Sequence, residues 1–437
     1  MDQIEKIYKF FQKSKGVTTD TRKSGDGLLY FALRGANFNG NAFAAQAIKD
    51  GCISAVVDDK DVWEEGMILV ENALNALQDL ATYHRLKMGA RVLALTGSNG
   101  KTTTKELIMQ VLSKKYRIIG TSGNYNNHIG VPLTLLTIKE DTEIAIIEMG
   151  ANHQREIALL CSIAQPDYGM ITNIGKAHLA GFGGIEGVKK GKGEMYDYLK
   201  ASGGTIFVNE SNPTLMGMLE NVENEIVTYV TNDNAQAFCS GRLLPTDIFL
   251  NVELFYNEPD KNNGKSAVIK TRLAGHHNFE NLLAAACIGL YFDIDIFDIK
   301  NAMEDYVPSN NRSQVLKTTH NTIVLDHYNA NPTSMAAAIK NFYSFTPGSK
   351  VLILGDMLEL DEYSTLEHAK IIDEVKKLEV QAYFVGPVFS ALIETGGNAF
   401  YNSEALRQHL AHIPVKNATI LLKGSRGIKL EVVLDNL

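Results

Sequence analysis

Short apolar runs separated by longer amphipathic stretches recur along the whole chain. The runs at 92–95, 144–147 and 168–171 are uncharged and strongly apolar, which is typical of strands buried on both faces of a parallel sheet. The segments between such runs have helical spacing of their apolar residues, as at 101–114. Strands that alternate with helices in this way predict a mostly parallel, doubly wound α/β sheet.

The same alternation precedes this region on a smaller scale. The runs at 28–33 and 53–57 predict two strands, with a helix over 42–49 between them. The segment 34–41 is rich in Gly and Asn and predicts turns, and a helix over 72–87 leads out of the unit. We therefore expect a small α/β unit at the N-terminus.

A further α/β pattern occupies the last third of the chain and predicts a second open sheet of Rossmann type. Its four strand candidates are 322–325, 351–354, 382–385 and 419–422. Before it, the alternation over 238–273 is typical of β-hairpins, and 278–291 is an Ala- and Leu-rich helix.

These patterns predict an α/β protein of three domains, since 437 residues are enough for two to four domains of ordinary size. The first, 1–87, is a small N-terminal α/β domain. The second, 88–309, is a central parallel-sheet domain of P-loop type, and the third, 310–437, is a C-terminal Rossmann-like domain. The segment 308–311, with Pro, Ser and two Asn, is the expected linker before the third domain.

Composition narrows the classes of partner. Charged residues make up 21% and hydrophobic residues 45%, which are ordinary globular values. The formal charge of −8 argues against nucleic acid as the main partner. The four cysteines are far apart and form no CxxC pair, so we expect neither a disulfide framework nor a zinc site. The N-terminus lacks an apolar signal sequence and no stretch is apolar enough to span a membrane, which predicts a cytoplasmic protein.

A phosphate-binding loop is the clearest chemical motif. Residues 96–103 read Thr-Gly-Ser-Asn-Gly-Lys-Thr-Thr and lie between a predicted strand and a predicted helix. Backbone N–H groups and a helix N-terminus form an anion site there, with Lys101 directed to the β- and γ-phosphates and Thr102 to Mg²⁺. Leu95 stands where the generic motif has its first Gly, so Gly97 serves as the earlier glycine of a variant loop. The alternative is an ordinary Gly-rich strand–helix turn.

Two further side chains that follow predicted strands, Glu148 and His178, are candidates for the same site. Glu148 follows the strand at 144–147, where a carboxylate can complete a Mg²⁺ site or be a solvated strand-end acid. His178 follows another strand, and composition leaves a structural and a functional histidine equally open. Lys192 belongs to a basic run, which by itself indicates a surface residue.

The phosphate loop resembles the ATP loop of the Mur ligases, the enzymes that build the stem peptide of peptidoglycan. Other motifs follow in family order at 123–132, 148–150, 172–178, 192–194, 275–278, 311–313 and 423–426. The branch of the family called MurF is resembled most at 20–22, 326–332 and 354–360, and the Asp-Asn-Pro-Arg motif of the sister ligases is lacking. Two departures from that branch are the Asn-Gly-Asn at 39–41 and Leu325, which replaces a second acid.

This resemblance implies an ATP-dependent ligase that adds D-Ala-D-Ala to UDP-MurNAc-tripeptide through an acyl phosphate, the last cytoplasmic step of peptidoglycan precursor synthesis. It implies ATP and Mg²⁺ as cofactors, small-molecule substrates bound partly by a UDP-binding N-terminal domain, no membrane span and a monomer. The alternatives are another Mur ligase or a ligase like folylpolyglutamate synthase. A P-loop regulator, which would need the phosphate loop but not His178 or Lys192, is an alternative of another class.

The resemblance also implies roles for individual residues. The catalytic residues are Lys101, Glu148, His178 and Lys192. The metal ligands are Thr102, Glu148, His178 and Lys192, with the lysine carbamylated to an anionic oxygen donor. The ATP-binding residues are Gly97, Ser98, Asn99, Gly100, Lys101, Thr102, Thr103, His277, Asn278, Asn281, Arg312 and Asp326. The substrate-binding residues are Asp20, Thr21, Arg22, Asn126, Asn127, Tyr328, Asn329 and Asn331.

From the residues alone, blander interpretations stay open. Asn278 and Asn281 are alternatively helix-capping residues, and the residues at 20–22 a helix cap. Asp356 and Glu359, in the motif at 354–360, are either part of the site or exposed acids at its rim.

Overall fold

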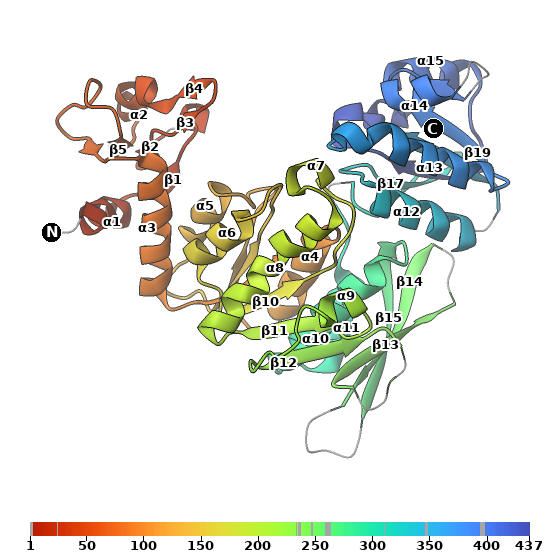
Figure 1. Ribbon diagram of the computed structural model, residues 1–437, viewed down its shortest axis with the longest axis horizontal. Helices are drawn as coiled ribbons and strands as arrows, with labels where there is room; N and C mark the ends of the chain where they lie inside the picture. The colour runs from red at the N-terminus through yellow and green to blue at the C-terminus, as the bar shows by residue number, and fades with distance from the viewer. Residues whose placement is uncertain are drawn as a thin grey trace.

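The computed structural model describes residues 3–23, 25–232, 234, 237–245, 248–257, 264–309, 311–345, 348–393 and 398–437. In these residues the strands form three large sheets and one two-stranded hairpin. The large sheets follow one another along the chain, and the N-terminal and C-terminal units flank the central unit (Figure 1). The predicted α/β class with three sheet-containing units is confirmed.

The N-terminal unit has a four-stranded parallel sheet in the order β1-β2-β5-β6. The strands and helices predicted there are confirmed, and the predicted turn segment contains the small antiparallel hairpin of β3 and β4. The elements are α1 (Gln3–Lys13), β1 (Val17–Thr18), η1 (Thr21–Lys23), β2 (Leu29–Phe31), β3 (Arg34–Gly35), β4 (Phe38–Asn39), η2 (Gly40–Phe43), α2 (Ala44–Lys49), β5 (Ser54–Val57), β6 (Ile68–Leu69) and α3 (Ala73–Met88).

The central unit has a nine-stranded sheet in the order β15-β14-β13-β12-β11-β10-β7-β9-β8. Its strands are parallel from β8 to β13, and the last three form antiparallel pairs. The strands are β7 (Arg91–Thr96), β8 (Ile118–Gly120), β9 (Ile144–Glu148), β10 (Tyr168–Ile171), β11 (Thr205–Asn209), β12 (Ile226–Val230), β13 (Cys239–Leu244), β14 (Phe249–Tyr256) and β15 (Lys265–Ala274). The helices are α4 (Lys101–Leu112), α5 (Gly130–Leu135), α6 (Glu156–Ala164), α7 (Leu179–Phe182), α8 (Ile185–Ser202), α9 (Pro213–Met216), α10 (Asn278–Tyr291) and α11 (Ile296–Asp305).

The hairpin prediction for 238–273 is confirmed in β13, β14 and β15, although its residues 246–247 and 258–263 lie outside the described residues.

The C-terminal unit has a six-stranded sheet in the order β16-β17-β21-β18-β19-β20, in which only β16 is antiparallel to its neighbour. All four strand predictions for this region are confirmed. The elements are β16 (Gln314–Lys317), β17 (Thr322–Asp326), α12 (Pro332–Phe345), β18 (Lys350–Gly355), η3 (Asp361–Tyr363), α13 (Ser364–Lys376), β19 (Gln381–Val385), α14 (Pro387–Leu392), β20 (Ala399–Phe400), α15 (Ser403–His412), β21 (Thr419–Lys423), η4 (Arg426–Ile428) and η5 (Leu430–Asn436). Asn310 of the expected linker lies outside the described residues, and the domain boundaries stay a prediction.

The strand order of the central sheet gathers the candidate chemistry at one edge. Strand β7 lies between β9 and β10 and is parallel to both. The segments that follow these three strands carry the phosphate loop, Glu148 and the turn at 172–178. Because carboxyl ends of parallel strands meet at the same edge, ligands of open α/β sheets bind there.

The N-terminal unit shares its apolar core with the central unit. Helix α3 packs against α5 and α6, and one buried cluster includes Leu77 and Leu80 of α3 with Leu135, Ile157 and Leu160. None of the helices within the described residues combines the length and the apolar character that crossing a membrane requires.

Arg85 fastens the same junction by polar contacts. Its Nε and Nη2 donate to the carbonyl oxygens of Ala164 and Gln165 at 3.2 and 2.9 Å. Nη2 also forms an ion pair with Asp167 at 2.7 Å, and Asp167 accepts a hydrogen bond from the backbone N–H of Val92 at the start of β7. The guanidinium therefore ties α3 to α6 and to the central sheet.

We expect Arg85→Ala to lower the free energy of unfolding by about 2 kcal/mol, because it leaves buried carbonyls without a donor and breaks a partly exposed ion pair. Urea unfolding followed by the fluorescence of Trp63, the single tryptophan, measures this effect in the N-terminal unit. Lys87→Ala is the control on the same helix, since this exposed ammonium lies only over the ring of Tyr83 at 5.3 Å. A midpoint for Arg85→Ala equal to that of the control would contradict the prediction.

Candidate functional site

A cavity of about 660 Å³ is lined by residues of both the central and the C-terminal units. It brings together most of the residues predicted from the sequence. These are Ser98, Asn99, Gly100, Lys101, Thr102, Thr103, Asn126, Asn127, Glu148, His178, His277, Asn278, Asn281, Arg312, Asp326, Tyr328, Asn329 and Asn331. Five predicted residues do not line it, namely Asp20, Thr21, Arg22, Gly97 and Lys192.

The phosphate loop has two positions that only glycine can occupy. Gly97 has a φ of 146°, and a Cβ atom there would stand 2.0 Å from Oγ1 of Thr172. Gly100, with a φ of 80°, would place a Cβ 2.5 Å from Oδ1 of Asn281. Both backbone conformations and both close approaches exclude a side chain. The loop therefore lies closely against Thr172 and Asn281.

The turn after β10 braces this loop. The backbone N–H groups of Ser98 and Asn99 donate to the backbone and side-chain oxygens of Asn173, both at 3.0 Å. Ser98 Oγ exchanges hydrogen bonds with the backbone of Gly175, and Thr172 Oγ1 donates to the Asn99 carbonyl at 2.6 Å. Sequence reasoning assigned no role to Thr172, Asn173 or Gly175. Their position after a strand that neighbours β7 was the available signal.

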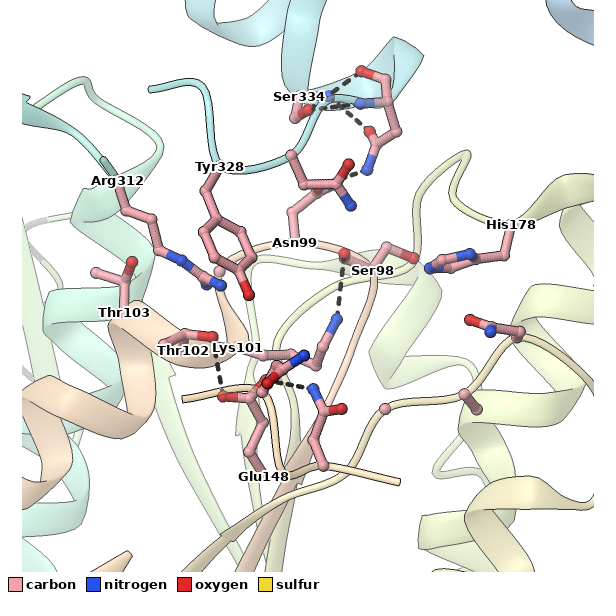
Figure 2. A pocket seen from close by; sticks show the side chains of 18 of the residues that line it. Ser98, Asn99, Lys101, Thr102, Thr103, Glu148, His178, Arg312, Tyr328 and Ser334 are labelled. Atoms are coloured by element: carbon pink, nitrogen blue, oxygen red, sulfur yellow. Dashed lines mark hydrogen bonds between the residues drawn. The ribbon is translucent and has the colours of Figure 1, made fainter. Parts of the chain in front are cut away.

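Lys101 opens helix α4 and folds back onto the loop. Its Nζ donates to the carbonyl oxygen of Gly97 at 2.6 Å and to that of Ser98 at 3.4 Å, and Figure 2 shows the contact with Ser98. Burial lowers the pKa of this ammonium, and the charge of Glu148 opposes the decrease. A cation on the first residue of a helix adds to the positive end of the helix dipole, so this corner attracts an anion.

Thr102 and Glu148 meet directly in the cavity. Oγ1 of Thr102 donates to Oε2 of Glu148 at 2.9 Å, and Asn126 Nδ2 donates to the other carboxylate oxygen at 2.9 Å (Figure 2). The backbone N–H of Glu148 donates to Thr121 Oγ1, which fixes the end of β9. A hydroxyl and a carboxylate beside a phosphate loop are the oxygen donors that Mg²⁺ prefers.

The remaining predicted metal ligands are not in mutual contact. His178 Nδ1 lies 3.0 Å from Glu359. Across the described ranges, no cluster of three or more His, Cys, Asp and Glu side chains is arranged to hold a metal ion.

Lys192 is buried in helix α8, with 1% of its surface exposed, so the surface position indicated by its basic run is wrong. Its Nζ donates to the carbonyl of Ala151 at 3.2 Å and lies 5.2 Å from the ring centre of Phe182. Since Ala151 lines the cavity, the amine lies directly behind the cavity wall. Burial, with a smaller contribution from Lys101, lowers the pKa of Lys192 to about 7.

The C-terminal unit contributes positive charge from the opposite wall. The guanidinium of Arg312 lies 3.9 Å from the ring centre of Tyr328, and its buried Nε has no hydrogen-bond partner among the described residues. Lys423, at the end of β21, forms a 2.7 Å ion pair with Asp326 at the end of β17. Asn331 Nδ2 donates to Asn99 Oδ1 at 2.7 Å, so the C-terminal unit touches the phosphate loop itself.

A recess of about 40 Å³ adjoins the cavity at the start of α10. It is lined by Ile248, Ala274, Gly275, His276, His277, Ser313, Val324, Asp326, Ala338, Asn341, Phe342 and Leu421. Burial lowers the pKa of His277, which keeps its imidazole neutral. Asn278 Nδ2 donates to Ala274 O and to Ser313 Oγ, and Asn281 donates to Asn278 Oδ1. These asparagines therefore connect the central unit to the segment that carries Arg312.

The N-terminal candidates lie outside the cavity. Asp20 and Arg22 pair with each other at 2.8 Å, and the hydrogen bonds from Arg22 lower the pKa of Asp20 to about 2. The adjacent Lys23 donates to the hydroxyl of Tyr125 at 3.5 Å, next to the cavity residue Asn126. The predicted residues at 20–22 thus lie beside the segment that forms one wall.

Asp356 and Glu359, for which the sequence left two interpretations, have different surroundings. Asp356 is fully buried and accepts from the backbone N–H groups of Val388 and Phe389 at the start of α14. Glu359 lines the cavity. Sequence reasoning also gave no role to the lining residues Asn124, His128, Asn152, Glu156, Ser313 and Ser334.

Comparisons with known proteins agree with this geometry. Residues 95–289 match the Mur ligase middle domain, and residues 311–426 match the Mur ligase glutamate ligase domain. The chain is 35% identical over 437 residues to UDP-N-acetylmuramoyl-tripeptide--D-alanyl-D-alanine ligase of Bacillus subtilis (strain 168), covering 97% of this chain and 93% of that protein. The ligase of the same name from Buchnera aphidicola subsp. Baizongia pistaciae (strain Bp) is 33% identical over 430 residues, covering 96% and 92%. A crystal structure of MurF from Acinetobacter baumannii superposes with a TM-score of 0.87 at 29% identity, covering 100% of this chain and 97% of that one.

Removal of the Lys101 ammonium should weaken the binding of a nucleoside triphosphate at least about 10-fold, because a charge-assisted contact to phosphate is lost. Isothermal titration of Lys101→Ala with a non-hydrolysable ATP analogue measures the change. Lys114→Ala is the control, since that ammonium lies near the end of the same helix and pairs only with Asp305 at 3.9 Å. An unchanged affinity of Lys101→Ala for the ATP analogue would show that the phosphate loop does not bind the nucleotide.

Proposed function

The chain belongs to the Mur ligase family, and we propose that it uses ATP to join D-alanyl-D-alanine to UDP-MurNAc-tripeptide, the last cytoplasmic step of peptidoglycan precursor synthesis. The observation that supports this proposal most is the cavity, in which the phosphate loop and Glu148 of the central unit face Arg312 and Asp326 of the C-terminal unit. Its relatives at 33–35% identity over almost their full length carry this activity in their names.

The proposed reaction has an electrostatic problem that these residues address. A carboxylate is a poor electrophile, so the γ-phosphoryl group of ATP is transferred to the tripeptide carboxylate and ADP leaves. The dipeptide ammonium then loses a proton, its neutral amine attacks the acyl carbon, and phosphate leaves as the amide bond forms. Carboxylate and triphosphate repel each other before that transfer. Lys101 on one wall and Arg312 on the other supply fixed positive charge where the two anions meet.

Magnesium fits the same corner. Thr102 and Glu148 would hold it, because their oxygens already lie 2.9 Å apart beside the phosphate loop. When bound, the ion neutralises phosphate charge and orients the phosphoryl group for in-line transfer.

The nucleoside of ATP is assigned to the junction of the two units. The recess beside His277 is largely apolar, as an adenine ring requires, and Asp326 lies at its edge, where ribose hydroxyls can donate to it. Asn278 and Asn281 support this region through their hydrogen bonds to Ala274 and to each other. Arg312, which is adjacent in sequence to the Ser313 that accepts from Asn278, would contact the phosphates.

The UDP-sugar end is assigned to the N-terminal unit. Asp20, Thr21 and Arg22 lie beside Tyr125 through the contact of Lys23, and the next residues, Asn126 and Asn127, line the cavity. A long substrate can therefore run from the N-terminal unit to the phosphate loop. Tyr328, Asn329 and Asn331 then remain for the dipeptide end. We propose a monomer that works in the cytoplasm without nucleic acid.

Phosphate release should depend strictly on both UDP-MurNAc-tripeptide and D-Ala-D-Ala, because neither partner alone completes the reaction. A coupled phosphate assay with one substrate omitted at a time, and mass spectrometry of the product, test this. If no phosphate is released when the dipeptide is left out, the protein is a ligase. A P-loop regulator would release phosphate with neither substrate present. Offering tripeptides that end in diaminopimelate or in lysine identifies the native acceptor.

We propose further that Lys192 is carbamylated. Only a neutral amine attacks CO₂, and the burial that lowers its pKa to about 7 leaves much of the amine neutral near physiological pH. The product would be an anionic oxygen donor next to Ala151 in the cavity wall, where an unmodified ammonium would oppose a nearby Mg²⁺. With Glu148 and His178 it would complete the set of metal ligands that the family resemblance implies.

Lys192→Ala should therefore reduce turnover at least about 100-fold, as expected when a metal-binding group of a reacting centre is removed. Bicarbonate or chloride should restore part of the activity in this variant. Mass spectrometry of the intact wild-type protein under CO₂ should show the added carbamate. Lys190→Ala, two residues earlier in the same basic run, is the control and should keep full activity. Full activity of Lys192→Ala without either anion would contradict the carbamate.

A further inference from the structure

Four carboxylates of the described residues line the cavity, and three of them are engaged by firm partners. Glu148 is bonded to Thr102 and Asn126 and is 2% exposed. Asp326 is paired with the permanent charge of Lys423 at 2.7 Å. Glu156 accepts from the backbone N–H groups of residues 152 and 153 and so closes the first turn of its own helix α6.

Glu359 is the fourth, and its situation differs. Its side chain is 55% exposed, and its contact at 3.0 Å is with His178, a residue that carries no permanent charge. The carboxylate of Glu359 thus faces the cavity without a permanently charged partner in contact with it.

The loop that carries Glu359 is held in a strained and well-supported conformation. Glu359 has a φ of 69°, in the left-handed region that a residue with a side chain rarely adopts. Just before it, the backbone N–H of Met357 donates to His368 Nε2 and that of Leu358 donates to Ser425 Oγ, both at 2.9 Å. Strain that the surroundings enforce in this way is characteristic of functional positions.

We propose that Glu359 binds the ammonium group of the incoming D-alanyl-D-alanine, an inference that rests on the proposed function. The dipeptide brings one positive charge into a cavity whose walls otherwise present Lys101, Arg312 and Lys423. These cations suit the phosphates and the carboxylates of the substrates, but they repel an ammonium. An accessible carboxylate is the group that can attract and orient it by charge-assisted hydrogen bonds.

The position of Glu359 agrees with this role. The residue belongs to the C-terminal unit, as do Tyr328, Asn329 and Asn331, which are assigned to the dipeptide, and its charge acts on Lys101 across the cavity. An ammonium held there lies between the dipeptide wall and the phosphate loop. Glu359 therefore selects an amine as the acceptor and directs it toward the activated carboxylate.

Glu359→Gln tests the proposal, because the amide keeps an oxygen that can accept from His178 while the negative charge is lost. We expect the KM for D-Ala-D-Ala to rise about 10- to 100-fold, the range for loss of a hydrogen bond to a charged group. The KM values for ATP and UDP-MurNAc-tripeptide should stay within twofold of wild type. Glu362→Gln is the control, an exposed carboxylate three residues further along the same segment.

A dipeptide analogue with a hydroxyl in place of the ammonium provides the second measurement. The wild-type enzyme should bind D-Ala-D-Ala more tightly than this analogue, whereas Glu359→Gln should lose most of that preference. An unchanged preference, or an equal rise in the KM for ATP, overturns the proposal, since the residue would then act on domain closure or on the nucleotide. Failure of wild type to form the pentapeptide would instead refute the proposed function, so the two failures are distinguishable.

Discussion

Convergence of positive charge from two separate units is the constraint on which the site depends. Lys101 belongs to the central sheet and Arg312 to the start of the C-terminal unit, and each of them faces the same cavity. Burial lowers the pKa of Lys101 most, the charge of Glu148 opposes this decrease, and the charge of Arg312 adds a smaller decrease, so the two cations repel each other across the cavity. Fixed positive charge from both units therefore attracts a polyanion such as a triphosphate to this cavity.

The two junctions of the chain differ in chemistry. The N-terminal and central units share one large apolar core, whereas the junction of the central and C-terminal units combines a small apolar contact at Ile248 and Ala274 with several polar contacts. Among these are Asn99 with Asn331, Lys176 with Glu367 at 2.9 Å, and His178 with Glu359. Polar contacts of this kind exchange readily for water when two units separate. This chemistry suits a site that must admit three substrates and then exclude water.

The sequence predicted the regular parts of this arrangement well because burial produces periodic patterns. The apolar runs at 92–95 and 351–354 are buried only when they form interior strands of a sheet. The buried strands β11 and β12 were not among the candidates, although both are apolar enough, since short runs of this kind do not distinguish strand from helix.

Residues whose role depends on neighbours from distant parts of the chain were harder. The basic run around Lys192 gives no sign that one member points inward, because only the packing of α8 against the central sheet decides which side is buried. Glu359 and Asp356 are separated by two residues and look alike in sequence, but one is accessible in the cavity and the other anchors α14. The sequence motif predicted where the phosphate loop lies, but it did not predict that Asn173 would support the loop by a hydrogen bond.

The shared core of the first two units has a consequence for how the chain can be divided. Helix α3 covers Leu135, Ile157 and Leu160 with its own leucines. A fragment that began at Gly89 would leave this face bare, and contiguous apolar surface of that kind promotes self-association. The part of the enzyme assigned to the sugar nucleotide is therefore also a structural cover for the part that handles ATP, and separation of the two would expose an apolar face on each.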